Sequence, residues 1–279
     1  MDQLELTVGE YTFTARADGP DDADLVLLLH GFPETSWEWR AQLPALATAG
    51  YRAVAPDQRG YAEGARPSAV EEYSVVKLAA DTVGFADTLG AERFHVVGHD
   101  WGGAVAWVCA ALYPDRVRTL TSVSTPHPTA MRKSILEGEQ REKSAYMDVF
   151  RAEGAEDLFL GNDAEVMRST FESFGFDAET IDEYMRVLRG PGAMTGGLNW
   201  YRANDFAASG DFALPPITVP TMYVWPDADE YLGREAAEAT AEYVDGPYRF
   251  EVLEGVSHWA PEEAAVALNA LLVDHLRSG

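Results

Sequence analysis

The sequence predicts an α/β protein with a mostly parallel sheet, helices on both faces of that sheet and an inserted helical segment. Short apolar runs recur along the chain, and the unbroken one at residues 25–29 is typical of a strand buried on both faces. They cover residues 25–29, 51–55, 94–97, 117–123, 221–225 and 249–253. Helical patterns separate most of these runs, at residues 74–89, 101–112, 233–243 and 261–276. This alternation of strand and helix indicates a doubly wound sheet.

Two segments depart from the alternation. Residues 4–8 and 12–15 alternate polar with apolar side chains around Gly9, which predicts an edge hairpin. Residues 129–211 show helical patterns rich in charge and aromatic side chains, with a break at residues 190–192. We therefore expect a core made of residues 1–128 and 212–279, with a helical cap of residues 129–211 inserted into it.

Composition narrows the classes of partner. The 279 residues are enough for one large domain with an insertion. With 46 acidic and 21 basic residues the net charge is −25, which repels nucleic acid and anionic membrane surfaces. The first residues contain no basic region followed by an apolar run, and Cys109 is the only cysteine. We expect a cytoplasmic protein without a disulfide and without a membrane or nucleic-acid partner.

The most informative stretch is residues 94–103, where a strand, a sharp turn and a helix follow one another around Asp100. Glycines at 98, 102 and 103 allow a strained turn and close packing of the helix on the sheet. This pattern predicts a nucleophile elbow with Asp100 in the position that serine hydrolases give to Ser. The alternative is an ordinary strand–turn–helix in which Asp100 caps the helix.

An aspartate nucleophile limits the possible reactions. A carboxylate is already ionised near neutral pH, and its attack on a carboxylic ester would only give an anhydride. Attack at a saturated carbon, with loss of an epoxide oxygen or a halide, leaves an ordinary alkyl ester on Asp100. Water can cleave that ester if a general base activates it.

His258 is the predicted base. It follows the last apolar strand and precedes the C-terminal helix, a loop from which histidine can activate water. The loop after residues 221–225 offers three carboxylates that could orient it, Asp227, Asp229 and Glu230.

Residues 30–34, His-Gly-Phe-Pro-Glu, follow the first long buried strand. A backbone N–H from this loop pairs with the N–H after the nucleophile to hold the oxyanion formed during ester hydrolysis. The predicted donors are Phe32 and Trp101. Gly31 lets the loop approach closely, and Pro33 stiffens it.

With these motifs the chain resembles the epoxide hydrolase branch of the α/β-hydrolase superfamily, which is related to the haloalkane dehalogenases. The resemblance implies the α/β-hydrolase fold with an inserted helical cap. It implies Asp229 as the acid, three residues after Pro226, where relatives commonly carry Gly. It also implies two cap tyrosines that donate hydrogen bonds to the epoxide oxygen, Tyr201 in residues 198–202 and Tyr146 in residues 144–150.

The expected reaction opens an epoxide to a vicinal diol through an ester on Asp100, which water activated by His258 then hydrolyses. The expected substrate is a small hydrophobic epoxide, with water as co-substrate and without a metal or an organic cofactor. Homodimerisation is plausible for the family. Further residues expected to bind substrate are His30, Gly31, Pro33, Trp37, Trp200 and Trp259.

Two alternatives remain open. Trp101 could form half of a halide cradle, as in haloalkane dehalogenases, but Phe32 stands where many of them carry Asn. Fluoroacetate-type dehalogenases carry Arg at the position of Trp101. The second alternative is a hydrolase fold that binds a hydrophobic ligand without catalysis. The retention of Asp100, Asp229 and His258 together argues against it.

Overall fold

The structure is a computed structural model that describes residues 1–205 and 214–279. The predicted end of the cap at residue 211 falls outside the described residues. An eight-stranded sheet runs through the described part of the chain in the order β1-β2-β4-β3-β5-β6-β7-β8. Its strands are β1 Asp2–Val8, β2 Tyr11–Asp18, β3 Leu25–Leu29, β4 Arg52–Pro56, β5 Phe94–His99, β6 Val117–Val123, β7 Thr221–Pro226 and β8 Tyr248–Leu253.

The predicted mostly parallel sheet is confirmed. Strands β3 to β8 pair in parallel, whereas β1 and β2 form an antiparallel hairpin that joins the sheet edge through β4. The hairpin turns at Gly9, whose φ of +59° is one that glycine adopts without strain.

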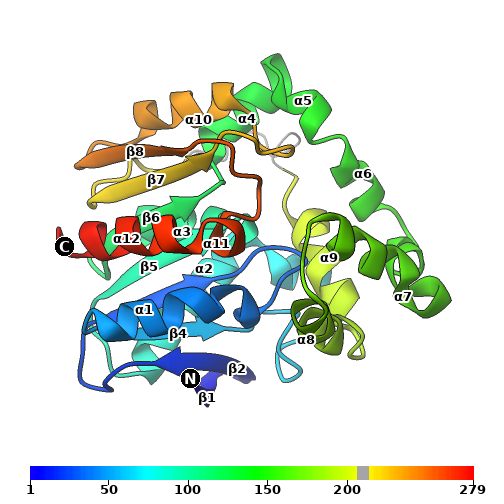
Figure 1. Ribbon diagram of the computed structural model, residues 1–279, viewed down its shortest axis with the longest axis horizontal. Coiled ribbons are helices and arrows are strands. Elements are labelled where there is room, and N and C mark those ends of the chain that lie inside the picture. Colours follow the sequence, from blue (N-terminus) through cyan, green and yellow to red (C-terminus); the bar gives the residue numbers. More distant parts are fainter. Residues whose placement is uncertain (206–213) are drawn as a thin grey trace.

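Helices cover both faces of the sheet, as Figure 1 shows. Helices α1 (Gln42–Thr48) and α12 (Ala265–Leu276) pack on one face, and α2 (Val75–Thr88) and α3 (Trp101–Leu112) on the other. Alternate residues of β3 therefore enter different cores: Val26 packs with Leu43 of α1, and Leu27 with Leu78 of α2. Burial on both faces is the physical reason why β3 is apolar at every position.

Some helix predictions differ from the structure. The predicted helix at 261–276 is broken into α11 (Ala260–Glu263) and α12, and the one at 233–243 into α10 (Arg234–Ala239) and a 3-10 turn. Helix α1 was not predicted, because its seven residues hold too few turns to give a clear helical period.

The inserted segment lies beyond the carboxyl ends of the parallel strands (Figure 1). Its helices are α4 Pro128–Glu137, α5 Gln140–Lys143, α6 Tyr146–Arg151, α7 Ala155–Ser173, α8 Ala178–Leu188 and α9 Ala193–Ala203. The break between α8 and α9 contains Gly192 at a φ of +78°. Hydrogen bonds tie this segment to the core: Trp200 donates to the carbonyl of Arg59, and Tyr184 to the carboxylate of Glu262.

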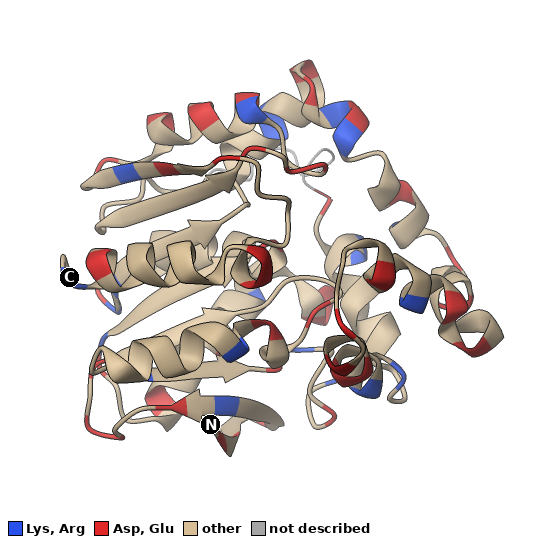
Figure 2. Cartoon of the chain, viewed as in Figure 1, with Lys and Arg blue, Asp and Glu red and all other residues tan. Residues whose placement is uncertain are grey.

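The acidic residues lie on core and inserted helices alike and are not gathered in one patch in the view of Figure 2. Among the described residues, no helix combines the length and the apolar character needed to cross a membrane. Cys109 is buried in α3 with a free thiol.

Candidate active site

The turn between β5 and α3 has the geometry expected of a nucleophile elbow. Asp100 has φ 49° and ψ −121°, a conformation that strains any residue other than glycine. A Cβ at Gly98 would lie 2.0 Å from the carbonyl oxygen of Gly102, and one at Gly102 would lie 1.9 Å from that of Leu29. The glycines therefore allow the chain to turn sharply and present Asp100 at the carboxyl end of the sheet.

His258 and Asp229 lie next to this carboxylate. Nε2 of His258 is 3.5 Å from Oδ2 of Asp100, and its Nδ1 is 2.8 Å from Oδ2 of Asp229. The other oxygen of Asp229 accepts hydrogen bonds from the backbone N–H groups of Tyr231 and Leu232. Of the three carboxylates in this loop, Asp229 is the one that contacts His258.

The charges of these groups are coupled. Burial alone would raise the pKa of Asp100, but the hydrogen bond and the charge of His258 outweigh it and hold that pKa below its ordinary value. Burial would lower the pKa of His258, but the charge of Asp229 and hydrogen bonds to both carboxylates raise it to about 9. The resting site is therefore an imidazolium between two carboxylates.

The loop after β3 approaches Asp100 closely. The N–H of Phe32 donates to Oδ1 of Asp100 over 2.9 Å. A Cβ at Gly31 would lie 2.5 Å from the Cβ of Asp100, so that only glycine permits this approach. The N–H of Trp101 belongs to the first turn of α3, where backbone N–H groups favour negative charge.

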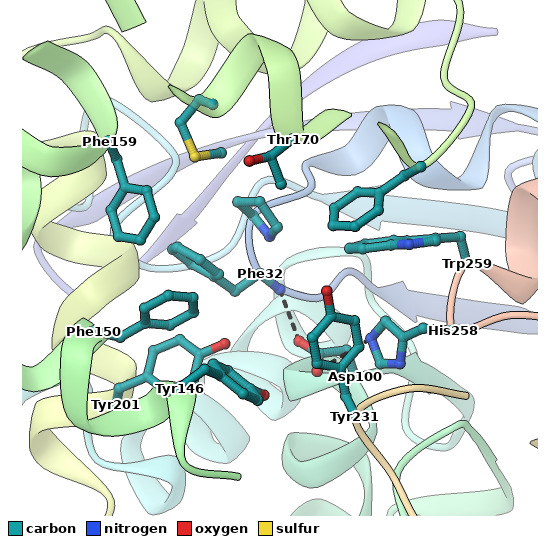
Figure 3. Close-up of a pocket in the computed structure, with 13 residues that line it drawn as sticks. Phe32, Asp100, Tyr146, Phe150, Phe159, Thr170, Tyr201, Tyr231, His258 and Trp259 are labelled. Atoms are coloured by element: carbon teal, nitrogen blue, oxygen red, sulfur yellow. Dashed lines mark hydrogen bonds and ion pairs between the residues drawn. The ribbon is translucent and has the colours of Figure 1, made fainter. Parts of the chain in front are cut away.

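Tyr146, the first residue of α6, and Tyr201, in α9, face Asp100 (Figure 3). Burial and then the charge of Asp100 raise the pKa of Tyr146 well above 10. The pKa of Tyr201 is also raised well above 10, by burial first and then by Tyr146 and Asp100. Both phenols are therefore neutral hydrogen-bond donors at the edge of the Asp100 carboxylate.

A largely apolar cavity opens over these groups, with about 470 Å³ of space not filled by protein atoms, part of it open to solvent. In Figure 3, Phe159, Phe150 and Phe32 border one side of it and Trp259 the other. Asp100, His258, Tyr146 and Tyr201 all line it, together with Pro33. Its apolar side chains are Phe32, Phe150, Phe159, Met167, Phe174 and Trp259.

Other residues expected to bind substrate lie outside this lining. His30 is fully buried, with its Nδ1 bonded to the carbonyl of Gly31 and its ring stacked on Trp200 at 6.0 Å. Trp37 lies between the guanidinium groups of Arg16 and Arg40. His30 and Gly31 therefore form part of the loop that approaches Asp100, Trp200 packs on that loop, and Trp37 contacts the two arginines.

A buried charged cluster of Glu34, Glu38 and His99 lies beneath His258. Nδ1 of His99 is 3.1 Å from Glu34 and 2.9 Å from Glu38, and its Nε2 is 2.8 Å from the carbonyl oxygen of His258. Glu38 also accepts a hydrogen bond from the N–H of Gly31. The cluster thus joins the loop that carries His258 to the loop that approaches Asp100.

Among the described residues, the side chains of this cluster lie close enough together to hold a metal ion. Burial would lower the pKa of His99, but the two glutamates raise it well above its ordinary value. Both ring nitrogens of His99 already have partners. An imidazolium therefore supplies the positive charge between these carboxylates.

Glu262 is a further buried carboxyl group, and its pKa predicts how the stability of the fold depends on pH. Burial and then the charge of Glu34 raise its pKa from 4.5 to about 8, although Arg40 and Tyr184 pull it down. The folded state keeps a proton that the unfolded state releases above about pH 4.5, so stability is lost as pH rises toward 8. We expect the midpoint temperature of thermal unfolding to decrease as the pH is raised from about 5 to 9. This decrease should be smaller in Glu262→Gln.

The measurement is a series of thermal melts of the wild type, Glu262→Gln and Glu254→Gln across that pH range. Glu254 is exposed and serves as the matched control, whose slope should equal that of the wild type. A Glu262→Gln slope that is identical to the wild-type slope would contradict the assignment of a buried, protonated Glu262.

Several residues at the site were not singled out in the sequence. His99 directly precedes Asp100, and Glu34 ends the His-Gly-Phe-Pro-Glu loop, so their positions beside two motifs were the available signal. Tyr231, two residues after Asp229, lines the cavity, and so does Thr170 of α7. No local pattern marks which face of a helix or loop meets the cavity.

Comparisons with known proteins place the chain among hydrolases. The family model described as the alpha/beta hydrolase fold matches residues 24–265. Epoxide hydrolase A of Mycobacterium tuberculosis is 36% identical, covering 92% of each chain, and Epoxide hydrolase 4 of Homo sapiens is 34% identical, covering 94% of this chain and 74% of the human protein. The crystal structure of Epoxide Hydrolase A from Mycobacterium thermoresistibile superposes with a TM-score of 0.84 at 33% identity, covering 99% of this chain and 98% of the other.

Proposed function

The chain belongs to the α/β-hydrolase fold family, and we propose that it is an epoxide hydrolase that opens a small hydrophobic epoxide to a vicinal diol. The observation that carries the proposal is the position of Asp100, with the buried base His258 on one side and two neutral phenols on the other. A nucleophile, a base and donors for a developing alkoxide are what the two steps of this reaction require. Relatives named epoxide hydrolases support it.

The first step forms the ester. The phenols of Tyr146 and Tyr201 donate hydrogen bonds to the epoxide oxygen, and Oδ2 or Oδ1 of Asp100 attacks one ring carbon. The carbon–oxygen bond of the ring breaks, its electron pair stays on oxygen, and a phenol proton neutralises the alkoxide. The product of the step is a hydroxyalkyl ester on Asp100, beside a phenolate.

The second step depends on a change in charge. The negative charge of Asp100 helps to keep the pKa of His258 near 9, and esterification removes that charge. The pKa of His258 therefore falls once the ester has formed. The imidazolium then gives its proton, through water, to the phenolate, and the neutral imidazole accepts a proton from the attacking water. Attack of this water on the carbonyl carbon of Asp100 gives an oxyanion, which the N–H groups of Phe32 and Trp101 stabilise. The ester bond to the substrate oxygen then breaks, this oxygen takes the remaining proton of the attacking water, and the diol leaves Asp100 as a carboxylate beside the imidazolium of His258.

A haloalkane dehalogenase with the same nucleophile is the second candidate. The side chain of Trp101, which would hold the halide, forms a hydrogen bond with Tyr201, and Phe32 supplies no side-chain donor. Incubation with an aryl epoxide, an alkyl epoxide and a haloalkane separates the possibilities, with diol and free halide as readouts. We expect diol. Halide without the opening of any epoxide would refute the proposal, and the absence of both products would favour a binding protein.

The two phenols should contribute to ring opening and not to ester hydrolysis. We expect Tyr201→Phe and Tyr146→Phe each to slow alkylation of Asp100 by about 10- to 100-fold, and the double variant by about 1000-fold or more. Rapid-quench single turnovers measure the two steps separately. Tyr61→Phe is the matched control, because the Tyr61 hydroxyl is buried, has no hydrogen-bond partner among residues 1–205 and 214–279, and lies outside the cavity lining. Equal slowing of both steps would argue against donation to the epoxide oxygen.

A further inference from the structure

The loop that carries Asp229 is bonded to the start of the inserted segment. Gln140, the first residue of α5, is fully buried, and both polar atoms of its side chain contact this loop. Its Nε2 donates to the carbonyl of Tyr231 over 2.6 Å, and its Oε1 accepts from the N–H of Gly233 over 2.9 Å. We call residues 229–233 the acid loop. One side chain of α5 therefore holds the acid loop by two hydrogen bonds.

The same part of the acid loop holds the carboxylate of Asp229. Oδ1 of Asp229 accepts from the N–H groups of Tyr231 over 2.7 Å and of Leu232 over 2.9 Å, while its Oδ2 faces His258 over 2.8 Å. The peptide group between Tyr231 and Leu232 thus donates to Asp229 with its N–H and accepts from Gln140 with its carbonyl. Because a peptide group is planar, the partner of its carbonyl also constrains the direction of its N–H. Gln140 therefore acts on a hydrogen bond that fixes the Asp229 carboxylate.

Further hydrogen bonds hold the acid loop from both sides. The ammonium group of Lys143, the last residue of α5, donates to the carbonyl of Asp229 over 2.9 Å and to that of Glu230 over 3.2 Å. The indole N–H of Trp225, in β7, donates to the carbonyl of Leu232 over 3.2 Å. The core and the inserted segment therefore share this loop, and the share of the inserted segment comes from two side chains of α5.

The position of Asp229 matters most after the ester has formed. Burial lowers the pKa of His258, and the charge of Asp229 does most to raise it, to about 9 in the resting site. Esterification removes the charge of Asp100, so that Asp229 is then the carboxylate bonded to the imidazole. A displaced Asp229 should therefore slow ester hydrolysis, which needs an oriented base, and should leave ring opening unchanged.

We propose that Gln140 is a positioning residue for ester hydrolysis, which holds the acid loop so that the carboxylate of Asp229 orients His258. It acts through these two residues and touches no substrate, because it lies outside the cavity lining. This inference rests on the proposed epoxide hydrolase activity and assigns a residue of the inserted segment to its second step.

The test is Gln140→Met, which keeps the length of the side chain and removes its donor and its acceptor. We expect ester hydrolysis to slow by about tenfold, the usual effect of losing one or two hydrogen bonds, and alkylation of Asp100 to stay within about twofold of the wild type. Rapid-quench single turnovers with an aryl epoxide measure the two steps separately.

Ser144→Ala is the matched control. Nε2 of Gln140 also donates to Oγ of Ser144 over 2.9 Å, so this variant removes a bond of the same amide within the inserted segment and leaves both bonds to the acid loop. Both steps should stay within about twofold of the wild type.

Two readouts separate positioning from a general loss of structure. In the Asp229→Asn background Gln140→Met should slow hydrolysis no further, because the charge that Gln140 positions is already absent. In the wild-type background Gln140→Met should also move the rise of the hydrolysis rate with pH toward lower pH, because a displaced Asp229 raises the pKa of His258 less.

Thermal melts show whether each variant is folded. If Gln140→Met does not fold, Lys143→Met tests the same attachment at a partly exposed side chain. We expect this variant to slow hydrolysis by about twofold to fivefold and to leave alkylation unchanged.

Equal slowing of both steps, or no slowing of either, would overturn the role of Gln140, and diol formation by the wild type would leave the proposed function standing. The same slowing in the Asp229→Asn background as in the wild type, or in Ser144→Ala as in Gln140→Met, would also overturn it. A wild type that forms no diol from an aryl epoxide would overturn the proposed function and this inference together.

Discussion

Asp100→Ala is expected to abolish epoxide turnover, with a fall in kcat/KM of more than about 1000-fold. No other carboxylate among the described residues lines the cavity, and the oxygens of Asp229 are occupied by His258 and by two backbone N–H groups. Nothing nearby can replace the lost nucleophile. Diol formation from an aryl epoxide, followed by chromatography, measures the effect.

The fold of this variant must be checked separately, because Asp100 has a positive φ that alanine adopts only with strain. A thermal melt and retained binding of the diol product would show that the cavity is intact. Substantial diol production by a folded Asp100→Ala variant would mean that water attacks the epoxide directly.

His258→Gln is expected to stop the reaction after its first step. Gln preserves much of the side-chain volume but cannot accept a proton from water, so the ester on Asp100 should persist. Rapid-quench experiments should show about one equivalent of epoxide consumed per site, with diol release slowed by about 1000-fold or more. Steady multiple turnover by the variant would show that His258 is not the base.

Asp229→Asn should have a smaller effect in the same direction, because the imidazole remains but loses its orienting charge.

The strands could be predicted where their sequence pattern follows directly from burial. A strand covered on both faces must be apolar at consecutive positions, which made β3 to β7 visible as runs. The alternation of β1 and β2 around Gly9 made the hairpin visible in the same way. Helix α1 and the division of the C-terminal helix into α11 and α12 were not predictable, because packing against the sheet decides whether such short segments are helical.

The site was predictable where one motif contains the information. The glycines at 98, 102 and 103 stand in the same short motif as Asp100, and His258 follows a recognisable strand. Asp229 needed the resemblance to a family to be chosen from three neighbouring carboxylates. Glu34 lies 65 residues from its partner His99, so that no local pattern links them. Tyr231 was missed for a related reason, since its place in the cavity follows from the residues that surround it in space.

The most direct test of the central claim is to locate the covalent bond. The His258→Gln variant is mixed with an aryl epoxide, quenched and digested, and the peptide that contains Asp100 is analysed by mass spectrometry. We predict that this peptide gains the mass of one epoxide, with fragment ions placing the addition on Asp100, and that Asp100→Ala/His258→Gln gains nothing. An unmodified Asp100 peptide from a variant that has consumed the epoxide would contradict the mechanism.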